Sequence, residues 1–233
     1  KTDASSGTTT TESTTKVTDA EGNEVSTTVT TETTTADNTT TVETATTNAD
    51  GTAEYATSTT TASGSVTATT TEVAASGKVT ITTESTSGKT STEATYTQAS
   101  ASKKEVTVKD LDTTKKTAAI PATVKAVDKD GNPTTYKVTK VAAGAMKGNK
   151  TVTKVTVGKN ITTIGKNAFK GDSKLKTISI NAKTLKTVGK NAFSGIAKKA
   201  TITLSGTAKQ VKAATKLIQK SGIAKTVTIK KAK

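Results

Sequence analysis

The stretch that decides the fold is Ile161–Asp172, with the sequence ITTIGKNAFKGD. It returns 24 residues later as LKTVGKNAFSGI at Leu185–Ile196, and a weaker copy, VTKVAAGAMKGN, stands 23 residues before it at Val138–Asn149. Each copy runs into a short segment in which apolar and polar residues alternate, as in a strand. A fixed period of this length predicts a solenoid, because one unit cannot bury its apolar side alone and stacked units share one core.

The repeat also predicts which side chains stack in that core. Equivalent positions of successive units lie above one another in a solenoid. One expected column contains Met146, Phe169 and Phe193. A second column, within a parallel sheet, is expected to contain Val155, Ile178 and Ile202. The intervening Lys and Thr residues would then face water.

The pattern Ile-x-x-Ile-Gly-x-x-Ala-Phe-x-Gly resembles the BspA-like leucine-rich repeats. The resemblance covers about residues 104–233 and is specific at Ile161–Ile180 and Leu185–Leu204. The cysteine that usually follows the last glycine in this family is replaced by Asn149, Asp172 and Ile196. The resemblance implies display at the cell surface and adhesion-type binding, and it carries over no catalytic residues.

Both ends of the repeat array are expected to be closed by capping elements, since the terminal units of a solenoid would otherwise expose the core. A helix is predicted at Thr207–Lys220, with Gly222 ending it, followed by a last strand at Thr226–Ile229. The strands predicted before the array are Glu105–Val108, Ala122–Val127 and Thr134–Val138, with a turn at Asp128–Asn132.

The first hundred residues have a different composition, with 38 Thr and few large apolar residues. Such a tract is typical of a disordered or glycosylated stalk. However, Thr suits strands, and turn residues recur at Gly22, Asn38, Gly51, Gly64, Gly77 and Gly88. This spacing predicts an antiparallel β-meander, single-layered or thin, with two-residue turns. Val42, Tyr55, Val66, Val79 and Ile81 all fall at even offsets from these markers, which predicts one mildly apolar face.

The net charge of the chain changes sign near residue 102, where the Thr-rich tract ends. Residues 1–102 hold 4 Lys and 13 acids, a net charge of −9, whereas residues 103–233 hold 30 Lys and 6 acids, a net charge of +24. We therefore expect two domains, 1–102 and 103–233, within a mainly β protein. A field this positive attracts polyanions. The chain has no Arg, so base-specific recognition of nucleic acid is not expected.

Catalytic, cofactor and metal sites are not expected. The chain contains no His and no Cys, which excludes the nucleophiles, bases and metal ligands that these residues supply. Asp128-x-Asp130-Gly131-Asn132 resembles the start of a calcium loop but lacks the terminal Glu, so a hairpin turn is the better interpretation. Gly165-Lys166 and Gly189-Lys190 are interpreted as repeat turns, since a phosphate loop has a longer motif. No stretch approaches the roughly 20 apolar residues of a transmembrane helix.

These observations together favour a secreted or cell-surface structural and adhesive protein without enzyme activity. Its expected partners are a cell-wall polyanion, or an extracellular protein or glycan. The alternative is a subunit that assembles into an extracellular filament or surface layer through head-to-tail contacts, since the two halves carry opposite charge.

Overall fold

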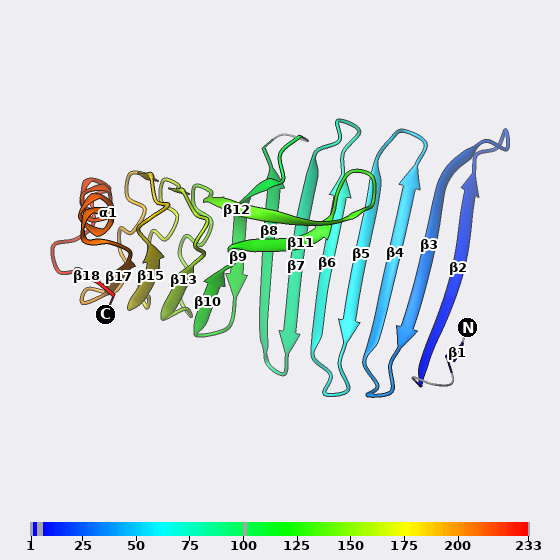
Figure 1. The fold of residues 1–233 in the computed structure, drawn as a ribbon, viewed down its shortest axis with the longest axis horizontal. Coiled ribbons are helices and arrows are strands. Elements are labelled where there is room, and N and C mark those ends of the chain that lie inside the picture. The colour runs from blue at the N-terminus through cyan, green and yellow to red at the C-terminus, as the bar shows by residue number, and fades with distance from the viewer. Residues whose placement is uncertain (1, 4–6, 100–101, 233) are drawn as a thin grey trace. The chain divides into compact units, whose positions relative to one another are not determined.

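The computed structural model describes residues 2–3, 7–99 and 102–232, which are mostly β-strands (Figure 1). The chain forms two compact units. The first unit comprises residues 1–91, 98–103 and 125–134, and the second comprises residues 92–97, 104–124 and 135–233. A β-rich fold with a single helix among the described residues confirms the predicted fold class.

The first unit contains the predicted antiparallel meander, whose strands pair in chain order. Its strands are β1 (Thr2–Asp3), β2 (Thr8–Thr18), β3 (Glu24–Thr34), β4 (Thr40–Asn48), β5 (Ala53–Thr60), β6 (Val66–Val73) and β7 (Val79–Ser87). They lie side by side in Figure 1. Thr supports this sheet because its branched Cβ fits a pleated surface, and facing hydroxyls pair across strands, as Thr28 and Thr46 do at 2.9 Å.

Five of the six marked turns are longer than the two-residue turns that the spacing suggested. The turn at Gly88 has the expected two residues, since β7 ends at Ser87 and the next strand begins at Thr90. Between β3 and β4, the Asn38 amide donates to the Thr35 carbonyl at 2.9 Å, and the Thr35 amide donates to the Thr39 carbonyl at 3.0 Å. This is a three-residue loop closed by a residue with positive φ, 59° at Asn38. The same pair of backbone hydrogen bonds closes the turns that contain Gly22, Gly51, Gly64, Gly77 and Gly131.

The prediction of a single mildly apolar face was wrong. Tyr55 pairs with Ala45 and Thr71, whereas Val42 pairs with Glu32 and Ser58. Throughout β3–β7, paired residues share the parity of their numbers, so odd-numbered residues form one face and even-numbered residues the other. From Asn38 to Gly77 the markers recur every 13 residues, an odd number, and equal offsets therefore fall on opposite faces in consecutive strands.

The two faces differ in burial. On the odd face, Thr71, Val73, Val79 and Ile81 are buried, whereas no even-numbered residue of β3–β7 is buried. The turn at residues 128–132 covers the middle of the odd face, since a Cβ on Gly131 would lie 2.9 Å from the Tyr55 ring. A hollow of about 260 Å³ remains there, lined by side chains that include Val29, Tyr55, Val127 and Pro133. The odd face of the meander is therefore partly covered by this turn.

The second unit is a solenoid. The elements that lie in it wholly or in part are β8 (Thr90–Gln98), β9 (Glu105–Thr113), β10 (Thr117–Ile120), β11 (Thr123–Val127), β12 (Pro133–Val141), β13 (Lys154–Val157), β14 (Thr163–Ile164), β15 (Thr177–Asn181), β16 (Thr187–Val188), β17 (Thr201–Ser205), α1 (Ala208–Lys220) and β18 (Thr228–Lys231). The ends of β8, residues 125–127 of β11 and residues 133–134 of β12 belong to the first unit. β10, β13, β15, β17 and β18 form one parallel sheet, and β9, β12, β14 and β16 form a second parallel ladder.

The stacked positions within the solenoid agree with the repeat. Val155 pairs with Ile178, which pairs with Ile202, and all three side chains are fully buried. In the other predicted column, the rings of Phe169 and Phe193 stack with centroids 5.5 Å apart. Successive units also exchange backbone hydrogen bonds, such as the Phe169 amide to the Ala192 carbonyl at 2.8 Å.

Steric contact between successive repeats explains the glycine of the repeat, at Gly165 and Gly189. A Cβ on Gly165 would lie 2.6 Å from the carbonyl carbon of Ala142, and a Cβ on Gly189 would lie 2.4 Å from the backbone nitrogen of Lys166. Backbone of one unit therefore packs directly against backbone of the next, and only glycine leaves room. Both Gly-Lys pairs are thus part of the repeat turns, as expected.

The helix α1 begins and ends where the sequence predicted. The Thr207 side chain accepts from the Gln210 amide at 3.3 Å and the Gln210 side chain accepts from the Thr207 amide at 2.9 Å, which is a capping box. Gly222, with φ 83°, follows the C-cap Ser221. Ala214 and Ile218 are the buried residues of this amphipathic helix. The last strand, β18, lies two residues beyond its predicted position.

Candidate binding groove

The outward face of the parallel sheet β10-β13-β15-β17-β18 presents small polar side chains in rows. Because side chains alternate along each strand, the residues between the buried column face away from the core. Thr156, Ser179, Thr203 and Lys230 occupy one row across adjacent strands. A second row contains Lys154, Thr177, Thr201 and Thr228. Adjacent strands are about 4.8 Å apart, so each row is a regular ladder of hydroxyl groups.

A hollow of about 430 Å³ lies at the carboxyl ends of these strands. Its polar lining consists of Thr156, Lys159, Ser179, Asn181, Thr203 and Ser205. A second hollow, lined by Asn181, Lys183, Ser205, Gly206, Thr207 and Gln210, shares Asn181 and Ser205 with the first. We call these two neighbouring hollows together, with their two sets of lining residues, the hydroxyl groove.

The hydroxyl groove is positively charged. Lys159 and Lys183 belong to its lining, and Lys230 stands beside Thr203 in the row that leads into it. All three side chains are exposed, and none forms an ion pair with a described residue. The linings of both hollows contain no Asp or Glu. The groove therefore combines hydroxyl and amide groups with uncompensated positive charge, which suits an anionic, oxygen-rich ligand.

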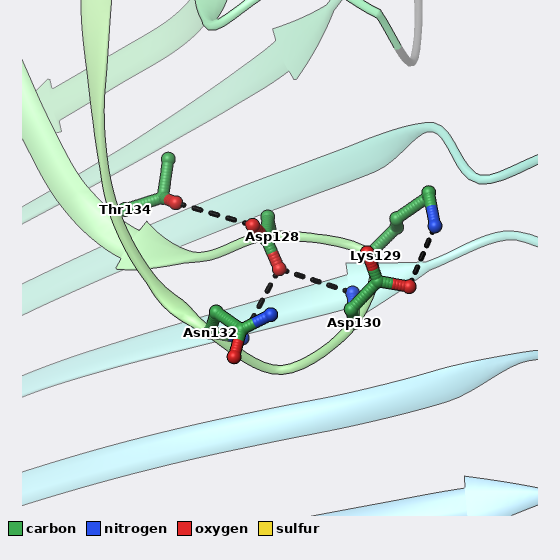
Figure 2. A network of polar contacts seen from close by, with 5 residues as sticks. All are labelled: Asp128, Lys129, Asp130, Asn132 and Thr134. Atoms are coloured by element: carbon green, nitrogen blue, oxygen red, sulfur yellow. Dashed lines mark hydrogen bonds and ion pairs between the residues drawn. The ribbon is translucent and has the colours of Figure 1, made fainter.

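The Asp128 loop forms the hairpin turn that its sequence suggested (Figure 2). The Asp128 Oδ1 atom accepts from the amides of Asp130 and Asn132 at 3.1 and 3.0 Å, and its Oδ2 atom accepts from the Thr134 hydroxyl at 3.4 Å. Both carboxylate oxygens thus bind the loop itself. Asp19 is used in the same way, since its Oδ1 atom accepts from the amides of Glu21 and Asn23. The Asn23 side-chain amide also donates to the Asp19 Oδ2 atom at 3.1 Å. These hydrogen bonds, of which that from the Asn23 side chain has the largest effect, lower the pKa of Asp19.

Two carboxylates line a separate hollow of about 290 Å³ in the second unit. Asp110 and Asp112 stand there beside Met146 and Asn149. Both acids are exposed and flank the buried Leu111, as expected for alternating positions of a strand. Acid–base catalysis by a carboxylate pair relies on burial or close approach to separate the two proton affinities, and this exposed pair lacks burial. Within the described residues, no three acidic side chains come together to hold a metal ion.

Asp172 is the one buried carboxyl group in the repeats. Its side chain is fully buried, and its Oδ1 atom accepts from the Asn149 amide of the preceding unit at 2.9 Å. Its Oδ2 atom has no hydrogen-bond partner among the described residues. Burial raises the pKa of Asp172 to about 7, against the opposing effect of that amide. Asp172 lines none of the hollows described here, and its hydrogen bond joins two repeats. The charge of the Lys-rich groove could be expected from composition, but the sequence did not show which lysines border it.

Comparison with known proteins identifies the repeats. The family model described as BspA type leucine-rich repeat region matches residues 134–229, in 6 copies. The solved structure of a leucine rich cell surface protein from Faecalibacterium prausnitzii is similar at 21% identity and a TM-score of 0.38. That match covers 53% of this chain and 32% of the other, so this chain spans about a third of its length. No curated protein matches the chain. No described helix has the length and apolarity needed to cross a membrane. The 23–24-residue repeat, the stacked core positions and the family match all fall on residues 134–229, and this part of the chain is similar to the BspA-type leucine-rich repeats.

Proposed function

We propose that the protein is a non-enzymatic binding protein of the cell surface, and that its repeat domain holds an anionic polymer in the hydroxyl groove. The repeat family supports this proposal, because leucine-rich repeats generally serve as interaction modules. The observation that carries it is the composition of the groove. Hydroxyl, amide and lysine groups line it beside apolar side chains such as Val157 and Ile180, and acids are missing from its lining.

The chemistry of the groove selects the class of polymer. Lysine offers a point charge without the planar fork of arginine, so it attracts phosphate or carboxylate groups without demanding one geometry. The groove contains no aromatic side chain. Stacking of sugar rings or bases is therefore not part of its recognition. A flexible polyol phosphate or an acidic glycan of a cell wall satisfies both conditions, since its charges repeat and its hydroxyls pair with the Thr and Ser ladder.

The first unit has a complementary role in this proposal. Its even face exposes Glu32, Glu54, Glu72 and Glu84 and carries no Lys in β3–β7. Such a face is repelled by the same polyanion that the groove attracts. The meander would thus act as an acidic spacer that stays off the anionic surface, while the repeat domain attaches to it.

Binding to purified polyol phosphate polymer tests the proposal. The triple variant Lys159→Gln, Lys183→Gln, Lys230→Gln removes the three groove lysines. The matched control is Lys209→Gln, Lys212→Gln, Lys216→Gln, which removes the same charge from exposed positions of α1. At about 1 kcal/mol for each lysine near an anionic surface, the groove variant should bind roughly 100-fold more weakly than wild type. An equal loss of affinity in both variants would mean that binding depends on overall charge and not on the groove. If the wild-type protein does not bind the polymer, the proposed function is wrong.

Head-to-tail assembly into a filament or surface layer is the second candidate. The observation that favours it is the division of charge between residues 1–102, at −9, and residues 103–233, at +24. Contacts between opposite charges weaken with salt. The mass in solution should therefore grow with concentration at low salt and collapse to one chain at high salt. A mass that ignores salt would count against this mode of assembly.

A further inference from the structure

The odd face of the meander carries a row of three oxygen-bearing side chains. Glu43 on β4 lies opposite Thr31 on β3 and opposite Thr57 on β5. Adjacent strands are about 4.8 Å apart, so the three side chains stand side by side. None of them forms a hydrogen bond or an ion pair with a described residue. The exposed Glu43 carboxylate is therefore a negative charge without a cation, flanked by two hydroxyl groups that are free to accept.

The neighbouring row on the same face is apolar. Val29, Ala45 and Tyr55 lie opposite one another on the same three strands. Each is two residues along its strand from the oxygen-bearing row, a distance of about 7 Å. Val127 and Pro133 add apolar surface from the covering turn, and both rows line the hollow of about 260 Å³ described above. All lining residues of this hollow belong to the first unit.

The turn that covers the hollow is closed by its own hydrogen bonds. The Asp128 amide donates to the Asn132 carbonyl at 2.9 Å, and the Gly131 amide donates to the Asp128 carbonyl at 3.0 Å. The Asp128 carboxylate accepts from the same loop, as Figure 2 shows. A Cβ on Gly131 would lie 2.9 Å from the Tyr55 ring, so glycine lets the turn rest on that ring. The hollow is thus formed in advance, which lowers the cost of binding a ligand.

We propose that this hollow binds a lysine side chain of a second copy of the chain. An ammonium group has three N–H donors, and the row centred on Glu43 offers three oxygen-bearing side chains, one of which neutralises the charge. The stem of lysine is about as long as the spacing between the two rows. It would lie on Val29 and Ala45 and against the Tyr55 ring, an arrangement that suits an aliphatic stem with a cationic end.

The charge of the chain favours a second copy as the source of this lysine. Every cationic side chain of the protein is a lysine, and residues 103–233 hold 30 of them against 6 acids. Residues 1–102, which include Glu43, have a net charge of −9. Opposite fields of this kind draw the basic half of one copy toward the acidic half of another. The inference therefore rests on the head-to-tail assembly considered above, for which it names the contact on the acidic half, and it does not depend on the hydroxyl groove.

A lysine analogue tests the hollow without assembly. Nα-acetyl-lysine methylamide should shift the NMR signals of the Tyr55 ring, which Tyr55→Phe assigns, and leave those of the buried Tyr96 and Tyr136 in place. The norleucine analogue, which has a similar stem without the ammonium group, should bind about tenfold more weakly, and Glu43→Gln should weaken binding of the lysine analogue by about tenfold. The matched control Glu54→Gln removes the same charge from the opposite face of β5 and should change the affinity little. Equal affinities in the two variants overturn the proposal.

Carbodiimide cross-linking at low salt tests the second copy. The reagent should join the Glu43 carboxyl carbon to the Nζ atom of a lysine in an amide bond, and the carbodiimide takes up the released water to become a urea. In a mixture of unlabelled and isotope-labelled chains, cross-linked peptides with one labelled partner come from two copies. We expect such mixed pairs between Glu43 and a lysine of residues 103–233. Pairs formed only within one chain overturn the proposal.

Light scattering at low salt separates failure of the hollow from failure of the assembly. The mass of wild type and of Glu54→Gln should grow with concentration, and that of Glu43→Gln should need about tenfold more protein to reach the same value. Equal growth in all three proteins would leave the assembly in place and exclude the hollow as its contact. A wild-type chain that stays monomeric would reject the assembly, and with it the second copy as the occupant.

Discussion

The rings of Phe169 and Phe193 lie parallel, 4° apart in plane and 5.5 Å between centroids. The two residues occupy the same position of successive repeats, 24 residues apart in the sequence. A stack this regular arises because the repeat moves the same side chain along the solenoid axis without rotating it far. The two stacked rings thus form a large part of the contact between the two repeats.

Phe193→Ala should therefore destabilise the second unit by about 3–5 kcal/mol, the usual cost of a large cavity at a buried aromatic position. Urea unfolding followed by circular dichroism at the helical band reports on this unit, since α1 is its helix. Lys186→Ala, at an exposed position of the same repeat, should change the midpoint little. An equally small change in the unfolding midpoint for both variants would contradict a core that the repeats share.

Gly189→Ala should also destabilise the repeats, for a steric reason rather than a conformational one. The added Cβ would meet the backbone nitrogen of Lys166 at 2.4 Å, so two units would have to move apart. We expect a loss of about 1–3 kcal/mol, as for overpacking of a core. Ala142 holds the equivalent place in the first repeat with its Cβ present, and Ala142→Gly should change stability by less. Thermal unfolding of the two variants compares them.

The repeat domain was predictable from sequence because its information is local and recurs. Ile-x-x-Ile-Gly fixes the position of each turn, and Ala-Phe three residues later fixes what stacks, so the columns of Ile178 and Phe169 followed from spacing alone. The bounds of β18 shifted, and β10, which begins the parallel sheet, was not among the predicted strands. The lining of the hydroxyl groove was not predictable, because its lysines, Lys159 and Lys183, come from different repeats and look like any other lysine of the chain.

The meander shows the opposite case. Its existence followed from the recurring Gly and Asn markers, but its faces did not, since face assignment depends on loop length. A three-residue loop pairs residues of the same parity, so with a 13-residue spacing of the markers Val42 and Tyr55 fall on opposite faces. The cover that residues 128–132 give to Tyr55 is a long-range contact, which local patterns do not encode.

Relieving a like-charge pair should stabilise the meander. Glu54 on β5 stands directly opposite Glu72 on β6, and both are exposed on the even face. Glu72→Gln should raise the stability of the first unit by about 0.2–1 kcal/mol at low salt. The gain should shrink as salt screens the repulsion. Glu84→Gln on β7, which faces Ala68, is the matched control and should give a smaller gain. Thermal unfolding at two salt concentrations distinguishes them.

Asp172 should make the stability of the repeat domain depend on pH. Burial raises its folded pKa to about 7 from an ordinary value of 3.8, so the folded state holds a proton that the unfolded state releases between those values. Stability from this group is therefore intact below about pH 4 and is lost as pH rises through 7. Asp172→Asn keeps the Oδ1 acceptor for the Asn149 amide and removes the charge. After allowance for solvent screening, the variant should be more stable than wild type by about 1–2 kcal/mol at pH 8 and nearly equal to it at pH 4. Urea unfolding at pH 4, 6 and 8 measures this difference. A gain of the same size at every pH would mean that packing, and not the buried charge, distinguishes the two side chains.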